Sequence, residues 1–188
     1  AGARHFGENY VQEALDKIGQ LSQPPQPLSD ITWHFIGPIQ SNKTRDIAAR
    51  FDWVHSVERL KIAQRLNDQR PAEAPPLSVC VQVNVSREAS KSGCAPGELA
   101  ALAAAIAELP RLRLRGLMAI PAPIAQSADP AQPYRLLREA FEALRALGLP
   151  VDTLSMGMSD DFELAITHGA THVRVGSALF GPRPSNPL

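Results

Sequence analysis

The stretch TLSMGMSDDFELAITHGATHVRVGS, residues 153–177, contains a complete strand–helix–strand unit. Thr153–Met156 and Thr171–Val175 are short runs rich in apolar and β-branched residues, which predict strands, and Asp160–His168 between them predicts a helix. A helix that connects two strands of one sheet makes those strands parallel. The stretch therefore decides the fold class, an α/β protein whose parallel strands are covered by helices.

The same alternation of apolar runs and helical segments extends through the rest of the chain. The other runs that predict strands are Arg4–Phe6, Ile31–Ile36, Trp53–Val57, Leu77–Val85 and Leu114–Ile120. The other segments that predict helices are Tyr10–Leu21, Asn42–Phe51, Glu58–Asn67, Gly97–Leu109 and Tyr134–Leu147. Together they predict seven parallel strands separated by helices.

A count of seven strands favours a barrel over an open sheet. A closed (β/α)8 barrel needs eight strands, at ~30 residues per unit in a total of ~250. We therefore predict a (β/α)8 TIM-type barrel that lacks its first β-strand unit in this chain, which also accounts for the start at Ala1 without a methionine. The competing architecture, a doubly wound open sheet, usually carries a G-x-G-x-x-G sequence after its first strand, and this sequence does not. Residues 1–188 are expected to form one N-terminally incomplete barrel domain.

The composition argues against several classes of function. Nineteen Lys and Arg residues balance nineteen Asp and Glu residues, which argues against a nucleic-acid groove and against a polybasic membrane patch. Cys80 and Cys94 are too few for a disulfide framework and lack metal-ligand spacing. The longest apolar stretch, Leu99–Ala107, is about half of the ~18 residues that indicate a membrane span. With no secretory signal visible at the start, we expect a cytoplasmic protein without nucleic-acid or membrane partners.

Polar loops after the strands predict a ligand site at one end of the barrel, because parallel α/β folds bind ligands at the carboxyl ends of their strands. The loops after the last two strands contain Ser159 and the pair Gly176-Ser177. A glycine lets backbone N–H groups approach an anion closely, and Ser177 begins a short turn toward Phe180, so these residues suit a phosphate. In the alternative interpretation Ser159 caps its helix and Gly176 makes a turn.

Other polar or sulfur-containing residues lie in the predicted strands or directly after them. Arg174 stands between Val173 and Val175, and a buried guanidinium needs an acceptor, either a structural carboxylate or a ligand. Three more residues lie near the same end of the barrel, although His and Met within strands are usually core residues: Asn9, His34 and Met118. The sequence contains no Walker loop and no H-E-x-x-H motif.

Six phrases in matching order, which extend over nearly all 188 residues, are shared with a known family. They are Phe6-Gly7-Glu8-Asn9-Tyr10, Trp33–Pro38 with Gln40–Lys43, Lys91-Ser92-Gly93, Gly116–Pro121, Gly157–Asp161 and Arg174-Val175-Gly176. In them the sequence resembles the pyridoxal phosphate homeostasis protein family. The resemblance implies a single-domain barrel of the alanine racemase N-terminal type that binds pyridoxal 5′-phosphate without established catalysis.

The resemblance also implies roles for residues at the phosphate end. Ser159, Gly176 and Ser177 correspond to residues that hold the phosphate of the cofactor, and Arg174 to the residue that faces its pyridine nitrogen. Arginine keeps its proton in proteins, so the pyridine nitrogen stays unprotonated and the ring is a poorer electron sink. This disfavours extensive carbanion chemistry.

The resemblance places Asn9 and Met118 in the ring pocket and His34 near it. The family's Schiff-base lysine lies on the first barrel strand, which corresponds to a position upstream of Ala1. The lysines within the chain are Lys17, Lys43, Lys61 and Lys91. None of them is assigned to the cofactor.

Family members are thought to hold pyridoxal 5′-phosphate or hand it over, with apoenzymes that depend on it as the expected recipients, and thereby to balance vitamin B6 pools. A pyridoxal-phosphate-dependent amino-acid racemase is the enzyme alternative. It requires a second domain and a catalytic tyrosine, and the tyrosines of this chain are Tyr10 and Tyr134. A phosphosugar-metabolising barrel would need an acid–base pair or a metal cluster, and neither is evident.

Overall fold

The computed structural model describes residues 2–23, 30–86, 92–124 and 128–181. In these residues seven strands form one parallel sheet, in which each strand pairs with the strand that precedes it in sequence. The strands are β1 (His5–Glu8), β2 (Thr32–Phe35), β3 (Trp53–Val57), β4 (Leu77–Gln82), β5 (Leu112–Met118), β6 (Thr153–Met158) and β7 (His172–Arg174). This sequential order excludes the doubly wound alternative, in which the strand order reverses.

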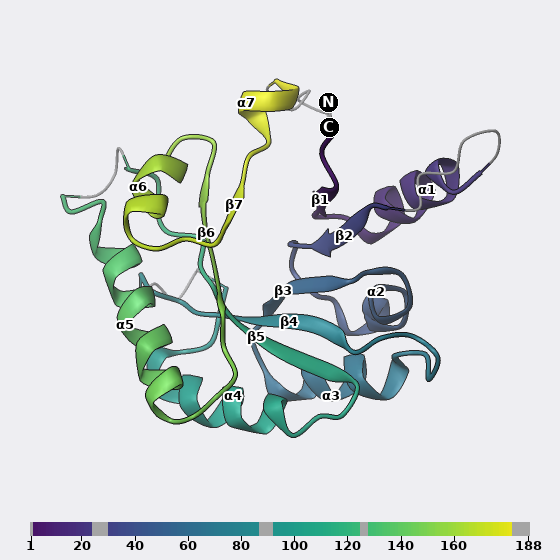
Figure 1. Cartoon of the computed structure of the whole chain (residues 1–188), viewed down its shortest axis with the longest axis horizontal. Coiled ribbons are helices and arrows are strands. Elements are labelled where there is room, and N and C mark those ends of the chain that lie inside the picture. The colour runs from purple at the N-terminus through teal and green to yellow at the C-terminus, as the bar shows by residue number, and fades with distance from the viewer. Residues whose placement is uncertain (1, 24–29, 87–91, 125–127, 182–188) are drawn as a thin grey trace.

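Helices alternate with the strands and lie around the sheet (Figure 1). They are α1 (Val11–Leu21), α2 (Thr44–Arg50), α3 (Leu60–Gln69), α4 (Leu99–Ala107), α5 (Gln132–Ala146), α6 (Phe162–Thr167) and α7 (Ser177–Phe180), with 3-10 turns η1 (Ser41–Lys43) and η2 (Pro96–Glu98). The predicted elements are confirmed, and the bounds of each strand differ from the prediction by three residues or fewer.

The sheet curls into a barrel rather than lying flat. The rings of Trp53 on β3 and His172 on β7 are 5.2 Å apart, centroid to centroid, and those of His34 on β2 and His172 are 6.1 Å apart. In a flat sheet β3 and β7 would be separated by about 19 Å, four times the spacing between neighbouring strands. The barrel prediction is therefore confirmed, with seven strands in the described residues, one fewer than a closed barrel contains.

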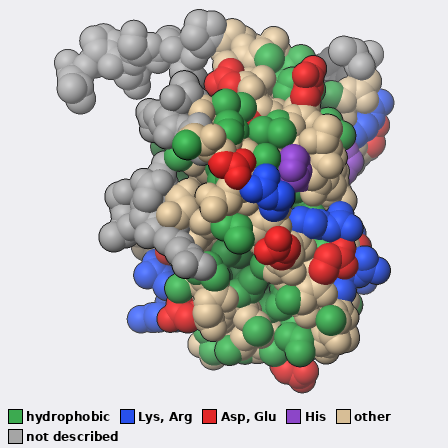
Figure 2. Space-filling view, turned by 90° about the vertical axis from the view of Figure 1, so that its left-hand side faces the viewer, with side chains coloured by type: hydrophobic (Ala, Val, Ile, Leu, Met, Phe, Trp, Pro, Cys, Tyr) green, Lys and Arg blue, Asp and Glu red, His purple; other side chains and the backbone are tan. Residues whose placement is uncertain are grey.

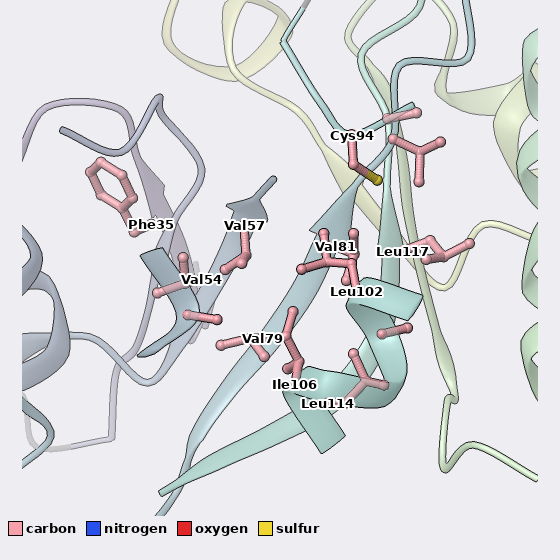
Figure 3. Close-up of a cluster of buried hydrophobic side chains, with 14 of the residues drawn as sticks. Phe35, Val54, Val57, Val79, Val81, Cys94, Leu102, Ile106, Leu114 and Leu117 are labelled. Carbon is pink, nitrogen blue, oxygen red and sulfur yellow. The ribbon is translucent and has the colours of Figure 1, made fainter. Parts of the chain in front are cut away.

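The outward side chains of the strands form the main apolar core with the helices (Figure 3). Val79 and Val81 on β4 and Leu114 on β5 are buried beside Ile106 of α4, a helix made up only of Leu, Ala and Ile. Burying a side chain of this size stabilises the fold by roughly 1.5–3 kcal/mol. This layer between strands and helices provides much of the apolar burial that holds the barrel together.

The inward side chains are of a different kind. Cys80 alternates with Val79 and Val81 along β4, and Ser155 alternates with Leu154 and Met156 along β6, so both point to the barrel side of the sheet. Barrel interiors are usually filled with Val, Ile and Leu. Here a group of polar, aromatic and sulfur-containing residues takes that position: His34, Trp53, His55, Cys80, Ser155, His172 and Arg174.

Charges on the surface are mixed. On the face that carries α5, acidic and basic side chains lie next to one another (Figure 2), as in the ion pairs Arg138–Glu142 and Arg135–Asp129. Exposed pairs of this kind contribute only about 0–1 kcal/mol each to stability. None of the helices in the described residues is long and apolar enough to cross a membrane.

Candidate functional site

The loops after β6 and β7 meet at one point. Ser159 Oγ accepts hydrogen bonds from the backbone N–H groups of Gly176, at 3.1 Å, and Ala178, at 3.3 Å. Ser177 lies between these two residues and begins α7. The structure therefore brings together the three residues that the sequence predicts to bind a phosphate.

This geometry corrects the alternative interpretation of Ser159 as a cap of its own helix. Helix α6 begins only at Phe162, its capping residue is Asp161, and no side chain caps it. The Ser159 hydroxyl instead faces the first turn of the next helix, α7. A Cβ atom added to Gly176 would meet open space, so an anion can approach its backbone there.

Arg174 lies at the end of β7 and is held by two neutral acceptors. Its Nη1 donates to Ser155 Oγ at 2.8 Å and its Nη2 donates to the Ala119 carbonyl oxygen at 2.9 Å. Burial lowers the pKa of Arg174 to about 10, the nearby Asp161 acts in the opposite direction, and the group stays charged at neutral pH.

The structure gives Arg174 no carboxylate partner among the described residues, so the structural ion pair considered from the sequence is wrong for that part of the chain. Asp161 is nearby but serves other groups, because it accepts from the Met158 N–H and from the Tyr134 hydroxyl. The Arg174 charge thus has Asp161 nearby but forms no direct ion pair with it. A guanidinium in this state can donate a further hydrogen bond to an acceptor atom of a ligand.

Met118 is fully buried at the end of β5 and pairs in register with Ser155 of β6. The next residue, Ala119, receives the Arg174 hydrogen bond and donates its own N–H to the Ser155 carbonyl oxygen at 3.2 Å. Met118 therefore lies beside the groups that hold Arg174, and that the two residues share a cofactor site stays a prediction.

His34 belongs to a row of hydrogen-bonded rings inside the barrel. Its Nε2 lies 2.9 Å from His5 Nδ1, and its Nδ1 lies 2.9 Å from His55 Nε2. His55 Nδ1 in turn lies 2.8 Å from Ser155 Oγ, the acceptor of Arg174. We call His5, His34, His55 and Ser155 the histidine chain; through it His34 is connected to Arg174.

Sequence reasoning missed most of this network. Four of the five histidines of the chain, His5, His34, His55 and His172, lie in predicted strands, and Ser155 does too. Polar residues at alternate positions of strands that are covered by helices were the available signal. They indicated a polar barrel interior.

Asn9 follows β1 and lies next to the loop after β2. The backbones of the two segments approach so closely that a Cβ atom on Gly37 would stand 2.1 Å from the Asn9 carbonyl oxygen. Gly37 is therefore required for the position of Asn9, which follows the first strand of the sheet, whereas Arg174 lies on the seventh. In the described residues Asn9 makes no hydrogen bond to the loops after β6 and β7.

Replacing Gly37 by Ala should destabilise the protein by about 1–3 kcal/mol, because the new methyl group must push the Asn9 backbone away. Urea denaturation followed by circular dichroism measures the change. Gly19→Ala on α1 is the matched control, since nothing lies within 4 Å of that position, and it should leave stability equal or higher. Equal stability of the two variants would contradict the assignment.

Three of the four lysines lie in the described residues. Lys17 on α1 pairs with Glu8 at 2.8 Å, Lys61 is exposed on α3, and Lys43 ends η1 after β2. Lys91 lies outside the described residues. That none of them holds the cofactor stays a prediction.

Comparison with known proteins identifies the family. Residues 1–184 match the family model described as the alanine racemase N-terminal domain. A pyridoxal phosphate homeostasis protein of Pseudomonas aeruginosa is 64% identical over 183 residues, which are 97% of this chain and 76% of the relative. The chain belongs to this family of pyridoxal phosphate homeostasis proteins. A member from Escherichia coli is 56% identical over 97% of this chain and 77% of its own length.

Solved structures of the family have the same fold. PipY of Synechococcus elongatus without pyridoxal phosphate superposes with a TM-score of 0.86 at 39% identity, covering 96% of this chain and 83% of PipY. PipY with pyridoxal phosphate bound gives a TM-score of 0.84 at 38% identity, covering 96% and 82%. Alanine racemase of Corynebacterium glutamicum, at 18% identity and a TM-score of 0.70, shares the fold alone; 100% of this chain and 50% of the racemase are covered. The resemblance stated from the sequence motifs is thus confirmed.

Proposed function

We propose that this protein binds pyridoxal 5′-phosphate at the carboxyl ends of its barrel strands and takes part in vitamin B6 homeostasis, holding the cofactor and handing it to apoenzymes that depend on it. The observation that carries the proposal is Arg174, a charged guanidinium inside the barrel whose partners in the structure are a hydroxyl and a carbonyl oxygen. The PipY structure with pyridoxal phosphate bound, at 38% identity, supports it.

The donor set suits the chemistry of this cofactor. The hydroxyls of Ser159 and Ser177 offer donors for a phosphate. The backbone N–H groups of Gly176 and Ala178 donate to Ser159 Oγ in the structure, and a bound phosphate would replace that oxygen as their acceptor. Arg174 offers a donor for the pyridine nitrogen. When bound, the cofactor supplies an aldehyde that reacts with amines, whereas the residues named here bind and orient it. Charge-assisted hydrogen bonds of this kind contribute roughly 1.5–3 kcal/mol each.

Several features favour holding the cofactor over catalysis. An arginine at the pyridine nitrogen keeps that nitrogen unprotonated, which weakens the ring as an electron sink. The Tyr134 hydroxyl donates to Asp161 from α5, outside the sheet, and Tyr10 is 57% exposed. Of the two tyrosines that could serve as the catalytic tyrosine of a racemase, Tyr134 is therefore hydrogen-bonded elsewhere and Tyr10 faces solvent. The names of the relatives describe homeostasis.

Calorimetric titration with pyridoxal 5′-phosphate, pyridoxal and inorganic phosphate tests the proposed function. We expect saturable binding of the phosphorylated cofactor and much weaker binding of pyridoxal. Pyridoxal has no phosphate group to accept hydrogen bonds at Ser159 and Gly176. Equal affinity for pyridoxal, or no saturable binding of the cofactor, would refute the proposal. Racemisation of alanine at a rate typical of enzymes would favour the alternative.

Replacing Arg174 by Gln should weaken binding of pyridoxal 5′-phosphate about 10- to 100-fold, which corresponds to the loss of one charge-assisted hydrogen bond. Arg113→Gln, an exposed arginine at the start of β5, is the matched control and should bind as the unaltered chain does. Circular dichroism establishes that both variants are folded. A folded Arg174 variant with undiminished affinity would show that Arg174 is structural.

A further inference from the structure

The histidine chain crosses the barrel interior from one strand to another. It links His5 on β1, His34 on β2, His55 on β3 and Ser155 on β6, and ends at Arg174 on β7. Successive partners are 2.8–2.9 Å apart, and His55 and Ser155 are separated by 100 residues in sequence. His34, His55 and Ser155 are buried, whereas His5 is exposed.

Arg174 decides the direction of every hydrogen bond in this chain. A guanidinium can only donate, so Arg174 occupies one lone pair of Ser155 Oγ. Of the two groups that contact Ser155 Oγ in the described residues, only His55 Nδ1 can accept the hydroxyl proton, so the Ser155 hydroxyl has a partner only if His55 Nδ1 accepts. His55 consequently carries its proton on Nε2.

The same argument continues along the row. His55 Nε2–H donates to His34 Nδ1, so His34 also carries its proton on Nε2. His34 Nε2–H donates to His5 Nδ1, which fixes the third ring in the same way. His34 and His55 must be neutral for this, and burial keeps both neutral by lowering the pKa of His34 to about 3 and that of His55 well below its ordinary value.

We propose that Ser155, His55 and His34 are positioning residues for Arg174, arranged as a one-directional chain in which all three histidines carry their proton on Nε2. The chain keeps the Ser155 hydroxyl turned away from Arg174, so that the guanidinium always finds an acceptor and holds one orientation toward the open end of the barrel. The hydrogen-bond directions do not depend on the proposed function. Only the purpose of the Arg174 orientation, which is to face the pyridine nitrogen of the cofactor, rests on it.

Histidine tautomers in the ligand-free protein test the chain directly. Nitrogen-15 NMR of the histidine-labelled chain distinguishes a proton on Nε2 from one on Nδ1. We expect His5, His34 and His55 all in the Nε2–H form. In Ser155→Ala the direction is no longer imposed, and His55 and His34 should show both forms. Ser155→Thr keeps the hydroxyl and should restore the single form, and Ser78→Ala, a buried serine of β4 outside the chain, should change nothing.

Binding measured on the same variants separates this inference from the proposed function. Ser155→Ala should bind pyridoxal 5′-phosphate about tenfold more weakly, since Arg174 keeps only the Ala119 acceptor, and Ser78→Ala should bind normally. His55 with its proton on Nδ1 in the unaltered protein, or an unchanged pattern in Ser155→Ala, overturns the inference. If Ser155→Ala does not fold, Arg174→Gln takes its place in the NMR experiment. A Gln side-chain oxygen can accept from the Ser155 hydroxyl, so His55 and His34 should then show both tautomers. A single Nε2–H tautomer in Arg174→Gln would also overturn the inference. If neither the unaltered protein nor any of the variants binds the cofactor, the proposed function is rejected, whereas the tautomer result still stands.

Discussion

Replacing Ser159 by Asp and Gly176 by Val in one chain should weaken binding of pyridoxal 5′-phosphate more than about 1000-fold. The carboxylate of Asp would stand where Ser159 Oγ now meets the N–H groups of Gly176 and Ala178, and it would repel the phosphate. The Val side chain would fill the open space beside residue 176. Losing two charge-assisted hydrogen bonds, at roughly 1.5–3 kcal/mol each, already accounts for about this factor.

The measurement is calorimetric titration with pyridoxal 5′-phosphate. Ser22→Asp with Gly19→Val, at the exposed end of α1, introduces the same two side chains far from the β6–β7 loops and should leave affinity unchanged. Thermal unfolding of both double variants establishes that the barrel persists. Undiminished affinity of the Ser159 and Gly176 variant would mean that the phosphate is bound elsewhere on the protein.

Acidification from pH 7.5 to 5.0 should lower the free energy of unfolding by about 4 kcal/mol through His34 and His55, about 2 kcal/mol for each ring. Both pKa values are lowered in the folded protein, first by burial and then by the neighbouring His5 for His34 and by His34 for His55. In the unfolded chain the rings take up protons near pH 6.5, whereas the folded protein excludes them. The stabilisation is therefore complete above pH 6.5 and is lost as the pH falls below that value.

Urea denaturation at a series of pH values measures this loss. His55→Gln keeps one donor and one acceptor but does not titrate, so its stability should fall by about 2 kcal/mol less over the same interval. His168→Gln, at the end of α6 and outside the histidine chain, is the control and should follow the unaltered protein. Parallel curves for His55→Gln and the unaltered protein would show that the His55 ring is not excluded from protonation.

The fold was predictable because its signals are local. Each strand is a short apolar run, each helix has its own pattern, and the segment from Thr153 to Ser177 alone fixes parallel pairing. The meeting of Ser159, Gly176 and Ser177 was predictable for a related reason, since barrels gather the loops after their last two strands at one place.

The histidine chain was not predictable from one sequence in the same way. His55 and Ser155 are 100 residues apart, and their contact depends on how far the sheet curls, which the hydrophobic pattern of a single strand does not specify. The partners of Arg174 were missed for the same reason. A carboxylate was one expected partner of Arg174. Because the sheet curves, Arg174 instead donates to the Ser155 hydroxyl and to the Ala119 carbonyl oxygen.

The strand order has a consequence for how the molecule assembles. Because every strand pairs with its predecessor in sequence, each ladder can close as soon as its second strand leaves the ribosome, and the apolar layer under the helices can grow in step with synthesis. Arg174 comes from the last strand, and its acceptors on β5 and β6 precede it. The acceptors that hold Arg174 can therefore be in place before Arg174 itself is synthesised.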